Sequence, residues 1–333
     1  MATRSSAIAF AALLGAMVVR RHELAARVGP LLQPLRVCVV LALLGGLVTY
    51  RVVPHMRGSF LKAGLSGIDL NKITTRRDGN GELVRPYVGP PVPEAMGAVS
   101  CAVYLVCLFL FIPVPFAQPG VPPYADAAFP HAELARLLCS LLSICCMCFL
   151  GFADNVLDLR WRDRLVLPLA ASLPVLMTYA ATGGVTTIKV PAVAQALLGT
   201  GANVDIGALY FVYISLLAIF CTNAINILAG VNGLEVGQSV VIGLTIAAFN
   251  TVQLLRWPDD PLLCAHNLFS LYIVLPFVGC SFGIGFVIIS HFYHVPHFYH
   301  TVTYTQNLDL FSLYIVLPFV GCSFGIYIVL ASS

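Results

Sequence analysis

The sequence predicts an all-α fold, a polytopic transmembrane helical bundle of about 8 spans (7–9). Apolar residues make up 59% of the 333 positions and charged residues only 10%, whereas a soluble chain is roughly 25% charged. The mean hydropathy is +0.90. Apolar runs recur at the length of about 20 residues that crosses a bilayer as a helix, and lipid admits only helices or closed barrels.

The same composition argues against several other classes of protein. A soluble enzyme or a disordered chain would carry more charge. The formal net charge of +3 is too small to indicate nucleic-acid binding. Most of the 11 cysteines lie inside apolar runs, where we expect small hydrophobic side chains rather than a disulfide scaffold; these are Cys101, Cys107, Cys139, Cys145, Cys146, Cys148, Cys221, Cys280 and Cys322.

Apolar windows place the expected spans. An early run at 7–19 is short and follows Arg4, so residues 1–36 are interpreted as an N-terminal extension, either a signal or transit segment or a short extra span. The windows that approach the length of a span are 37–53, 95–116, 136–153, 165–185, 206–226, 234–254, 267–290 and 308–331.

Basic residues set the expected orientation. The loop 51–94 is rich in Lys and Arg, the loop 117–135 has none, and the loop 154–164 has three arginines. By the positive-inside rule the first and third of these loops face the cytosol, and counting spans places 227–233 there as well. The arginines before residue 37 do not fit this scheme.

Three polar clusters flank the predicted spans, and polar groups at membrane depth are costly enough to indicate function. The first follows the third window and includes Asp154, Asn155, Asp158 and Arg164. Asp154 and Asp158 would share a helix face. Carboxylates beside arginines suit a divalent metal and phosphate groups, but a salt-bridged helix end explains the pattern equally well.

The second cluster interrupts an uncharged run with Asn223, Asn226, Gly230, Asn232 and Gly233. Asparagine side chains can bind a hard cation or a base edge. Hydrogen bonding between helices is the alternative. The density of asparagines in one turn-like stretch favours a binding site.

The third cluster lies at the expected cytosolic ends of two consecutive spans. Asp69, Leu70 and Lys72 follow the first span, and Glu94 precedes the second. We expect these residues to line one mouth, although this signal is weak by itself. The segment 69–93, which is rich in turn residues, is expected to form a polar loop that joins the two spans.

A repeat marks the C-terminal region. Residues 268–284 recur without change at 310–326. Natural transporter repeats diverge in sequence, so we interpret 37–290 as the core of the protein, in incomplete form, and 291–333 as an aberrant tail.

Taken in order, these clusters resemble the polyprenyl-phosphate N-acetylhexosamine-1-phosphate transferase family, of the glycosyltransferase 4 type. The resemblance runs from about residue 40 to about residue 277, and its most specific part is the last of the matching segments. These are 69–72 (DLNK), 93–97 (PEAMG), 128–131 (AFPH), 151–154 (GFAD), 159–162 (LRWR) and 221–235 (CTNAINILAGVNGLE).

The resemblance implies an activity. Eukaryotic members transfer GlcNAc-1-phosphate from UDP-GlcNAc to dolichyl phosphate, releasing UMP, on the cytosolic face of the endoplasmic reticulum (ER) membrane as the first step of N-glycan precursor assembly. It also implies Mg²⁺, which neutralises charge on the diphosphate. The implied partners are therefore a nucleotide sugar, a lipid phosphate and the bilayer, with no nucleic acid; a homodimer stays open.

Individual roles follow from the same resemblance. Asn226 matches a magnesium ligand, Asn232 and Leu70 match uridine contacts, and Glu94 lies on the diphosphate side of the pocket. Asp154 matches the first residue of an acidic pair assigned to acceptor chemistry or metal support. The expected site therefore has Asp154, Asn155 and Arg164 as catalytic residues, Leu70, Glu94, Asn232, Asp69 and Asn223 as substrate-binding residues, and Asn226 as the metal ligand.

The sequence also departs from the family pattern. Asn155 replaces the second aspartate, and Arg164 replaces a lysine, which keeps the charge but alters the geometry. A Phe-Val-Gly-Asp-Thr-Phe segment carrying the second magnesium ligand is missing, and no Lys or Arg follows Arg256. The alternatives are an impaired or inactive truncated isoform, a prokaryotic-type transferase acting on undecaprenyl phosphate, and a small-solute transporter.

Overall fold

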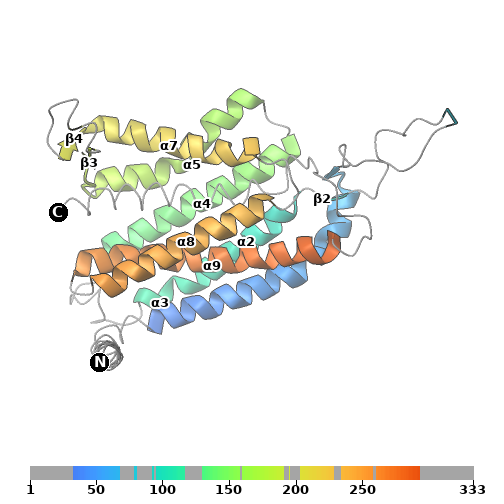
Figure 1. Ribbon diagram of the computed structural model, residues 1–333, viewed down its shortest axis with the longest axis horizontal. Helices are drawn as coiled ribbons and strands as arrows, with labels where there is room; N and C mark the ends of the chain where they lie inside the picture. Colours follow the sequence, from blue (N-terminus) through green and yellow to red (C-terminus); the bar gives the residue numbers. More distant parts are fainter. Residues whose placement is uncertain are drawn as a thin grey trace, which may run out of the picture.

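The computed structural model describes residues 33–67, 79–80, 92–93, 95–116, 130–157, 160–190, 195, 203–228, 234–257 and 260–292. Within these ranges the chain is almost entirely helical, and its long helices run along one common axis (Figure 1). The predicted all-α membrane fold is confirmed. The helices are Gln33–Lys62, α2 (Met96–Phe111), α3 (Pro113–Phe116), α4 (His131–Leu157), α5 (Trp161–Ala181), α7 (Ala208–Leu228), α8 (Leu234–Arg256) and α9 (Pro261–Phe292).

Each predicted span up to 267–290 coincides with a helix, and the window 308–331 lies outside the described residues. Length and composition make five of the described helices candidate membrane spans: Gln33–Lys62, Met96–Phe116, His131–Asp154, Val236–Arg256 and Pro261–Ile288. Two shorter apolar stretches, Leu165–Ala181 and Ala208–Ala224, follow the same axis. Large apolar side chains such as Leu43, Phe149 and Val241 face outward, as expected of helices that face lipid.

Two small antiparallel strand pairs cap opposite ends of the bundle. At one end β1 (Ser66–Gly67) pairs with β2 (Val92–Pro93), and at the other β3 (Thr187–Lys189) pairs with β4 (Asn203–Asp205) (Figure 1). The sequence did not predict either pair. Strands of two or three residues carry too little alternation of polar and apolar residues to be recognised.

Helix α9 is the centre of the bundle, with 72% of its most apolar stretch buried. Its glycines allow the first helix to approach at backbone distance. A Cβ atom at Gly279 would lie 2.0 Å from the carbonyl oxygen of Ala42, and one at Gly283 would lie 2.3 Å from that of Gly46. Small residues at such crossings are how membrane helices associate, because lipid supplies no hydrophobic driving force between them.

Helix α2 packs against α9 through aromatic and polar contacts. The ring of Tyr104 meets Phe277 edge-on, with centroids 5.9 Å apart, and its hydroxyl donates a hydrogen bond of 3.1 Å to the carbonyl oxygen of Ile273. At the end of the bundle that carries β1 and β2, Met96 joins Val53, Val236 and Ile284 in a separate buried cluster. The first helix, α2, α8 and α9 therefore form one central group.

Helices α4, α5 and α7 form a second layer beside that group. Leu137, Leu141 and Ile144 of α4 belong to the central core, whereas Met147 and Leu150 pack on Ala171 of α5. Leu176 of α5 packs in turn on Tyr210 and Ile214 of α7. Helix α4 therefore connects the second layer to the central group.

Candidate functional site

The described ends of the helices that carry Asp154 and Asn226 lie at the end of the bundle that carries β1 and β2. Because successive helices alternate in direction, α4 and α7 end there, and α2, α5 and α8 begin there (Figure 1). The turns between α4 and α5 and between α7 and α8 carry the first and second polar clusters. The fold therefore brings to one end the helix ends beside the first two clusters and the strand pair that flanks the third.

Asp154 lies in the last turn of α4 and is 2% exposed. A buried carboxylate is costly unless charge or hydrogen bonds compensate it, so its retention at a membrane edge indicates a role beyond packing. Asn155 follows it on α4, and Arg164 lies in the first turn of α5; the side chains of both fall outside the described part of the structure. The backbone places all three at one helix-to-helix turn.

Asn223 lies near the end of α7 and is partly buried. Its amide nitrogen donates a hydrogen bond of 2.9 Å to the carbonyl oxygen of Ile219, one turn earlier on the same helix. This hydrogen bond fixes the orientation of the Asn223 amide near the end of α7.

Asn226 follows Asn223 within α7, which ends at Leu228, and α8 begins at Leu234. Asn232 falls in the intervening residues 229–233, and both it and the side chain of Asn226 lie outside what the structure describes. The end of α7 and the start of α8 lie at the same end of the bundle as Asp154.

The third cluster is anchored by the β1–β2 pair. Ser66 is the register partner of Pro93, and Gly67 is the partner of Val92. The strand pair therefore joins the residues just before Asp69 and Leu70 to the residues just before Glu94. These three residues are outside the described ranges, but the pairing supports the expectation that the two stretches lie at one mouth.

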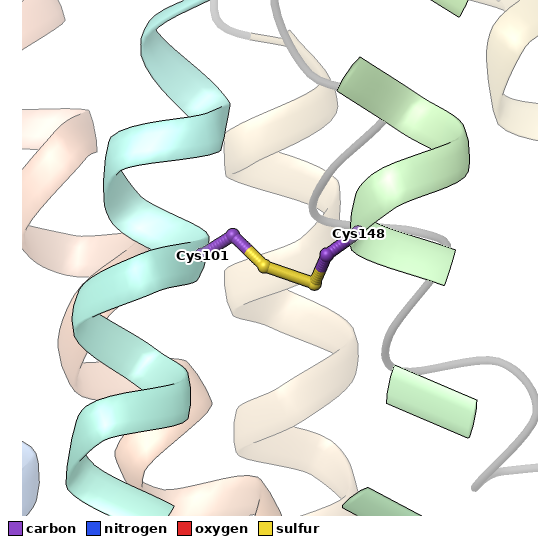
Figure 2. The surroundings of a disulfide bond; sticks show 2 residues. All are labelled: Cys101 and Cys148. Carbon is purple, nitrogen blue, oxygen red and sulfur yellow. A yellow bond between two sulfur atoms is a disulfide. The ribbon is translucent and has the colours of Figure 1, made fainter. Parts of the chain in front are cut away.

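The cysteine prediction was wrong at two positions. Cys101 of α2 and Cys148 of α4 form a disulfide with a Cα–Cα distance of 6.4 Å, and Figure 2 shows it bridging the two helices. The other described cysteines are free thiols. No sequence signal could have found this pair, because the two residues are 47 positions apart and their approach depends on how α2 and α4 pack.

A magnesium ion would find only part of its ligand set among the described residues. Hard cations prefer carboxylate and amide oxygens, and Asp154 supplies one buried carboxylate. Within the described ranges no three His, Cys, Asp or Glu side chains converge on one point. The expected amide ligand, Asn226, lies two residues before the end of α7, and its side chain falls outside the described part of the structure.

Comparison with curated proteins gives relatives that carry one enzyme name. The chain is 39% identical over 265 residues to the UDP-N-acetylglucosamine–dolichyl-phosphate N-acetylglucosaminephosphotransferase of Schizosaccharomyces pombe, covering 76% of this chain and 56% of that protein. It is 38% identical over 255 residues to the enzyme of that name from Dictyostelium discoideum, covering 72% and 57%. A third, from Leishmania amazonensis, is 31% identical over 322 residues, covering 73% and 67%.

The chain thus spans about half the length of the first curated relatives that it matches. A family model described as glycosyl transferase family 4 matches residues 137–327, which include the turns that carry Asp154 and Asn226. With its helical membrane fold and this match over more than half of its length, the chain belongs to glycosyl transferase family 4.

Proposed function

We propose that this chain carries the nucleotide-sugar and lipid-phosphate site of a transferase that moves GlcNAc-1-phosphate from UDP-GlcNAc to dolichyl phosphate. An oxygen of the lipid phosphate attacks the phosphorus that bears the sugar, the bond to UMP breaks, and GlcNAc-diphosphodolichol forms. The names of the relatives support this reaction. The structural observation that supports it is that α4 and α7 end, and α5 and α8 begin, at the same end of the bundle.

A membrane edge suits this reaction because one substrate is a lipid and the other is soluble in water. Asp154, Asn155 and Arg164 are proposed to act at the transferred phosphate, where the guanidinium of Arg164 can bind phosphate oxygens. Leu70 and Asn232 are proposed to contact uridine, with Asp69, Glu94 and Asn223 around the rest of the donor. The β1–β2 pair, which anchors the segments of Asp69 and Glu94, supports one shared pocket.

Mg²⁺ is the proposed cofactor, held by Asn226 with support from Asp154. When bound, it would neutralise negative charge on the diphosphate. The burial of Asp154 supports this assignment, because a cation would compensate a carboxylate that water does not reach.

The proposed location is the ER membrane, with the site facing the cytosol. Arg57, Lys62, Arg160 and Arg162 lie at the site end of the described helices. Positive charge of this kind marks cytosolic loops. Labelling of single cysteines placed at residue 160 and at residue 186 with an impermeant maleimide, on sealed microsomes, tests the orientation: residue 160 should react from the cytosolic side and residue 186 should not.

A second proposal concerns turnover. The sequence lacks the Phe-Val-Gly-Asp-Thr-Phe segment of the family and any Lys or Arg after Arg256. This chain is therefore proposed to bind UDP-GlcNAc but to release UMP slowly. The test is to purify the chain, measure Mg²⁺-dependent binding of UDP-GlcNAc, and measure UMP release with dolichyl phosphate. Absence of binding would contradict the proposed site, and rapid UMP release would contradict the proposed impairment.

A further inference from the structure

The Cys101–Cys148 disulfide lies on the side of the bundle that holds the proposed site. Cys148 precedes Asp154 on α4 by about 9 Å of helix, and Cys101 follows the start of α2 by about 7.5 Å, at 1.5 Å per residue. The start of α2 in turn comes directly after Glu94 and Ala95. The bond therefore connects the two helices that lead to Asp154 and to Glu94 (Figure 2).

Noncovalent packing ties α4 to the central group mainly at the other end. Leu137, Leu141 and Ile144 join the central core, and Cys148 is the last described hydrophobic side chain of α4 that packs against it. Beyond Ile144, the buried side chains Met147 and Leu150 turn to α5 instead. Among the described residues, the core cluster at the site end combines the first helix, α2, α8 and α9 without any side chain from α4.

We propose that the Cys101–Cys148 disulfide is a positioning element of the site, which holds the α4–α5 pair against α2 and so fixes Asp154 relative to the residues before α2. The inference rests on the proposed function, because the site that it positions is that one. Cleavage of the bond leaves the rest of the bundle folded but loosens the last turns of α4. A small displacement of a group that contacts substrate is costly for binding and catalysis.

The surroundings of the bond protect it from hydrophilic reductants. Cys101 is 3% exposed, and both cysteines lie within candidate membrane spans. Reduction requires attack by a thiolate. Glutathione enters an apolar interior at high cost, because its carboxylates and ammonium group stay charged even when its thiol is protonated. We expect glutathione to leave the bond intact. A neutral dithiol such as dithiothreitol reduces it by giving two electrons and two protons, which yields two cysteine thiols and a cyclic disulfide.

The experiment compares the purified full chain in three forms: oxidised, reduced with dithiothreitol, and carrying both Cys101→Ser and Cys148→Ser. Cys145→Ser with Cys146→Ser is the matched control, because these neighbours on α4 are free thiols. Hydrogen exchange is followed in peptides covering 149–157 and 137–144, and UDP-GlcNAc affinity is measured with Mg²⁺. Reduction tests the proposal without mutation if the double variant fails to fold.

The expected result is exchange about tenfold faster in 149–157 and little changed in 137–144, as for a local opening, together with UDP-GlcNAc affinity about tenfold weaker. Air oxidation of the reduced chain should restore both values, and the control variant should match the oxidised chain. Unchanged exchange in 149–157 would overturn the proposal regardless of any ligand, as would faster exchange with unchanged affinity. A failure of the oxidised chain to bind UDP-GlcNAc would instead contradict the proposed function.

Discussion

At the scale of single residues, Asp154 is the side chain on which the functional interpretation depends most. It combines near-complete burial with a place in the last turn of α4. A carboxylate kept in such a position lowers stability unless a compensating charge is present. The charge of Asp154 is therefore expected to favour substrate binding but not stability. A substitution that removes the charge can measure the two effects separately.

Replacement of Asp154 by Asn keeps the shape of the side chain and removes its charge. We expect UDP-GlcNAc affinity in the presence of Mg²⁺ to fall by about tenfold or more, the usual order when a group that supports a metal is lost. The melting temperature should change little, because the side chain keeps its volume. Calorimetry and a thermal melt in detergent measure the two effects.

Asp163→Asn is the control for Asp154→Asn. Asp163 is an exposed acid in the first turn of α5, close to the same end of the bundle, and its substitution should change neither affinity nor melting temperature. If Asp154→Asn lowered the melting temperature but left the affinity intact, Asp154 would be a structural residue and the proposed site would lose its main support.

The sequence predicted where Asp154 would lie but not how the cysteines pair. An acidic residue that follows an apolar run can be recognised from the sequence alone. Because the run is expected to span the membrane, the acid is expected at the membrane edge, where it indicates function. The approach of Cys101 to Cys148 depends on the packing of α2 against α4, and buried cysteines that pack as small hydrophobic residues have the same sequence pattern. The side-chain placement of Asn226 and Asn232 stays a prediction.

At the scale of elements, apolar windows located the helices because a membrane requires about 20 apolar residues in a helix. Their ends were less predictable. The first helix begins at Gln33 rather than at residue 37, and α9 begins at Pro261 rather than at residue 267. Helices continue into the polar boundary of the bilayer, where an apolar window no longer detects them.

The repeat allows two copies of one sequence to be tested against each other. Gly279 lies in the first copy and meets the backbone of Ala42, and Gly321 is its counterpart in the second copy. Gly279→Leu should destabilise the protein by about 1–3 kcal/mol or more, since overpacking separates two backbones in contact. Gly321→Leu should have little effect if 291–333 is an aberrant tail, and thermal melts in detergent measure both.

Equal destabilisation by the two substitutions would contradict the assignment of 291–333 as a dispensable tail. A milder effect of Gly279→Leu than of Gly321→Leu would contradict the packing of α9 against the first helix as well. The shared local sequence removes helix propensity as an explanation for any difference, because both glycines have the same 17-residue segment around them.

Hydrogen bonds to Asp205, in the β3–β4 pair at the opposite end, predict a pH dependence of stability. The hydroxyl of Thr186 and then the backbone N–H of Gly207 donate hydrogen bonds to the carboxylate of Asp205, and both lower the pKa of Asp205 below its usual value. Because the pKa of Asp205 is lowered in the folded state, these hydrogen bonds stabilise the fold at pH values above the pKa that Asp205 has in the unfolded chain. This stabilisation is lost as the pH falls through the pKa of Asp205 in the folded protein.

Thr186→Val should therefore raise the pKa of Asp205, and isotope-edited infrared titration of the carboxylate measures the change. Thr182→Val is a suitable control, since the Thr182 hydroxyl bonds to carbonyl oxygens of its own helix. A pKa of Asp205 that did not move in Thr186→Val would contradict the hydrogen bond that the structure places between these residues.

At the scale of the whole molecule, two helical layers meet at α4, and the helix ends that carry Asp154 and Asn226 lie at one end of the bundle. The central group is built around α9, whereas α4, α5 and α7 form the second layer. A site at this end draws residues from both layers. Its integrity therefore depends on how the layers are held together, which the composition of the chain does not reveal.

The most direct test of the account measures donor binding and UMP release on the same purified chain, beside the longer relative from Schizosaccharomyces pombe. The account predicts Mg²⁺-dependent binding of UDP-GlcNAc, with UMP release at least about 100-fold slower than that of the relative, the order expected when a group that stabilises developing charge is missing. UMP release at the rate of the relative, or no binding of UDP-GlcNAc, would contradict it.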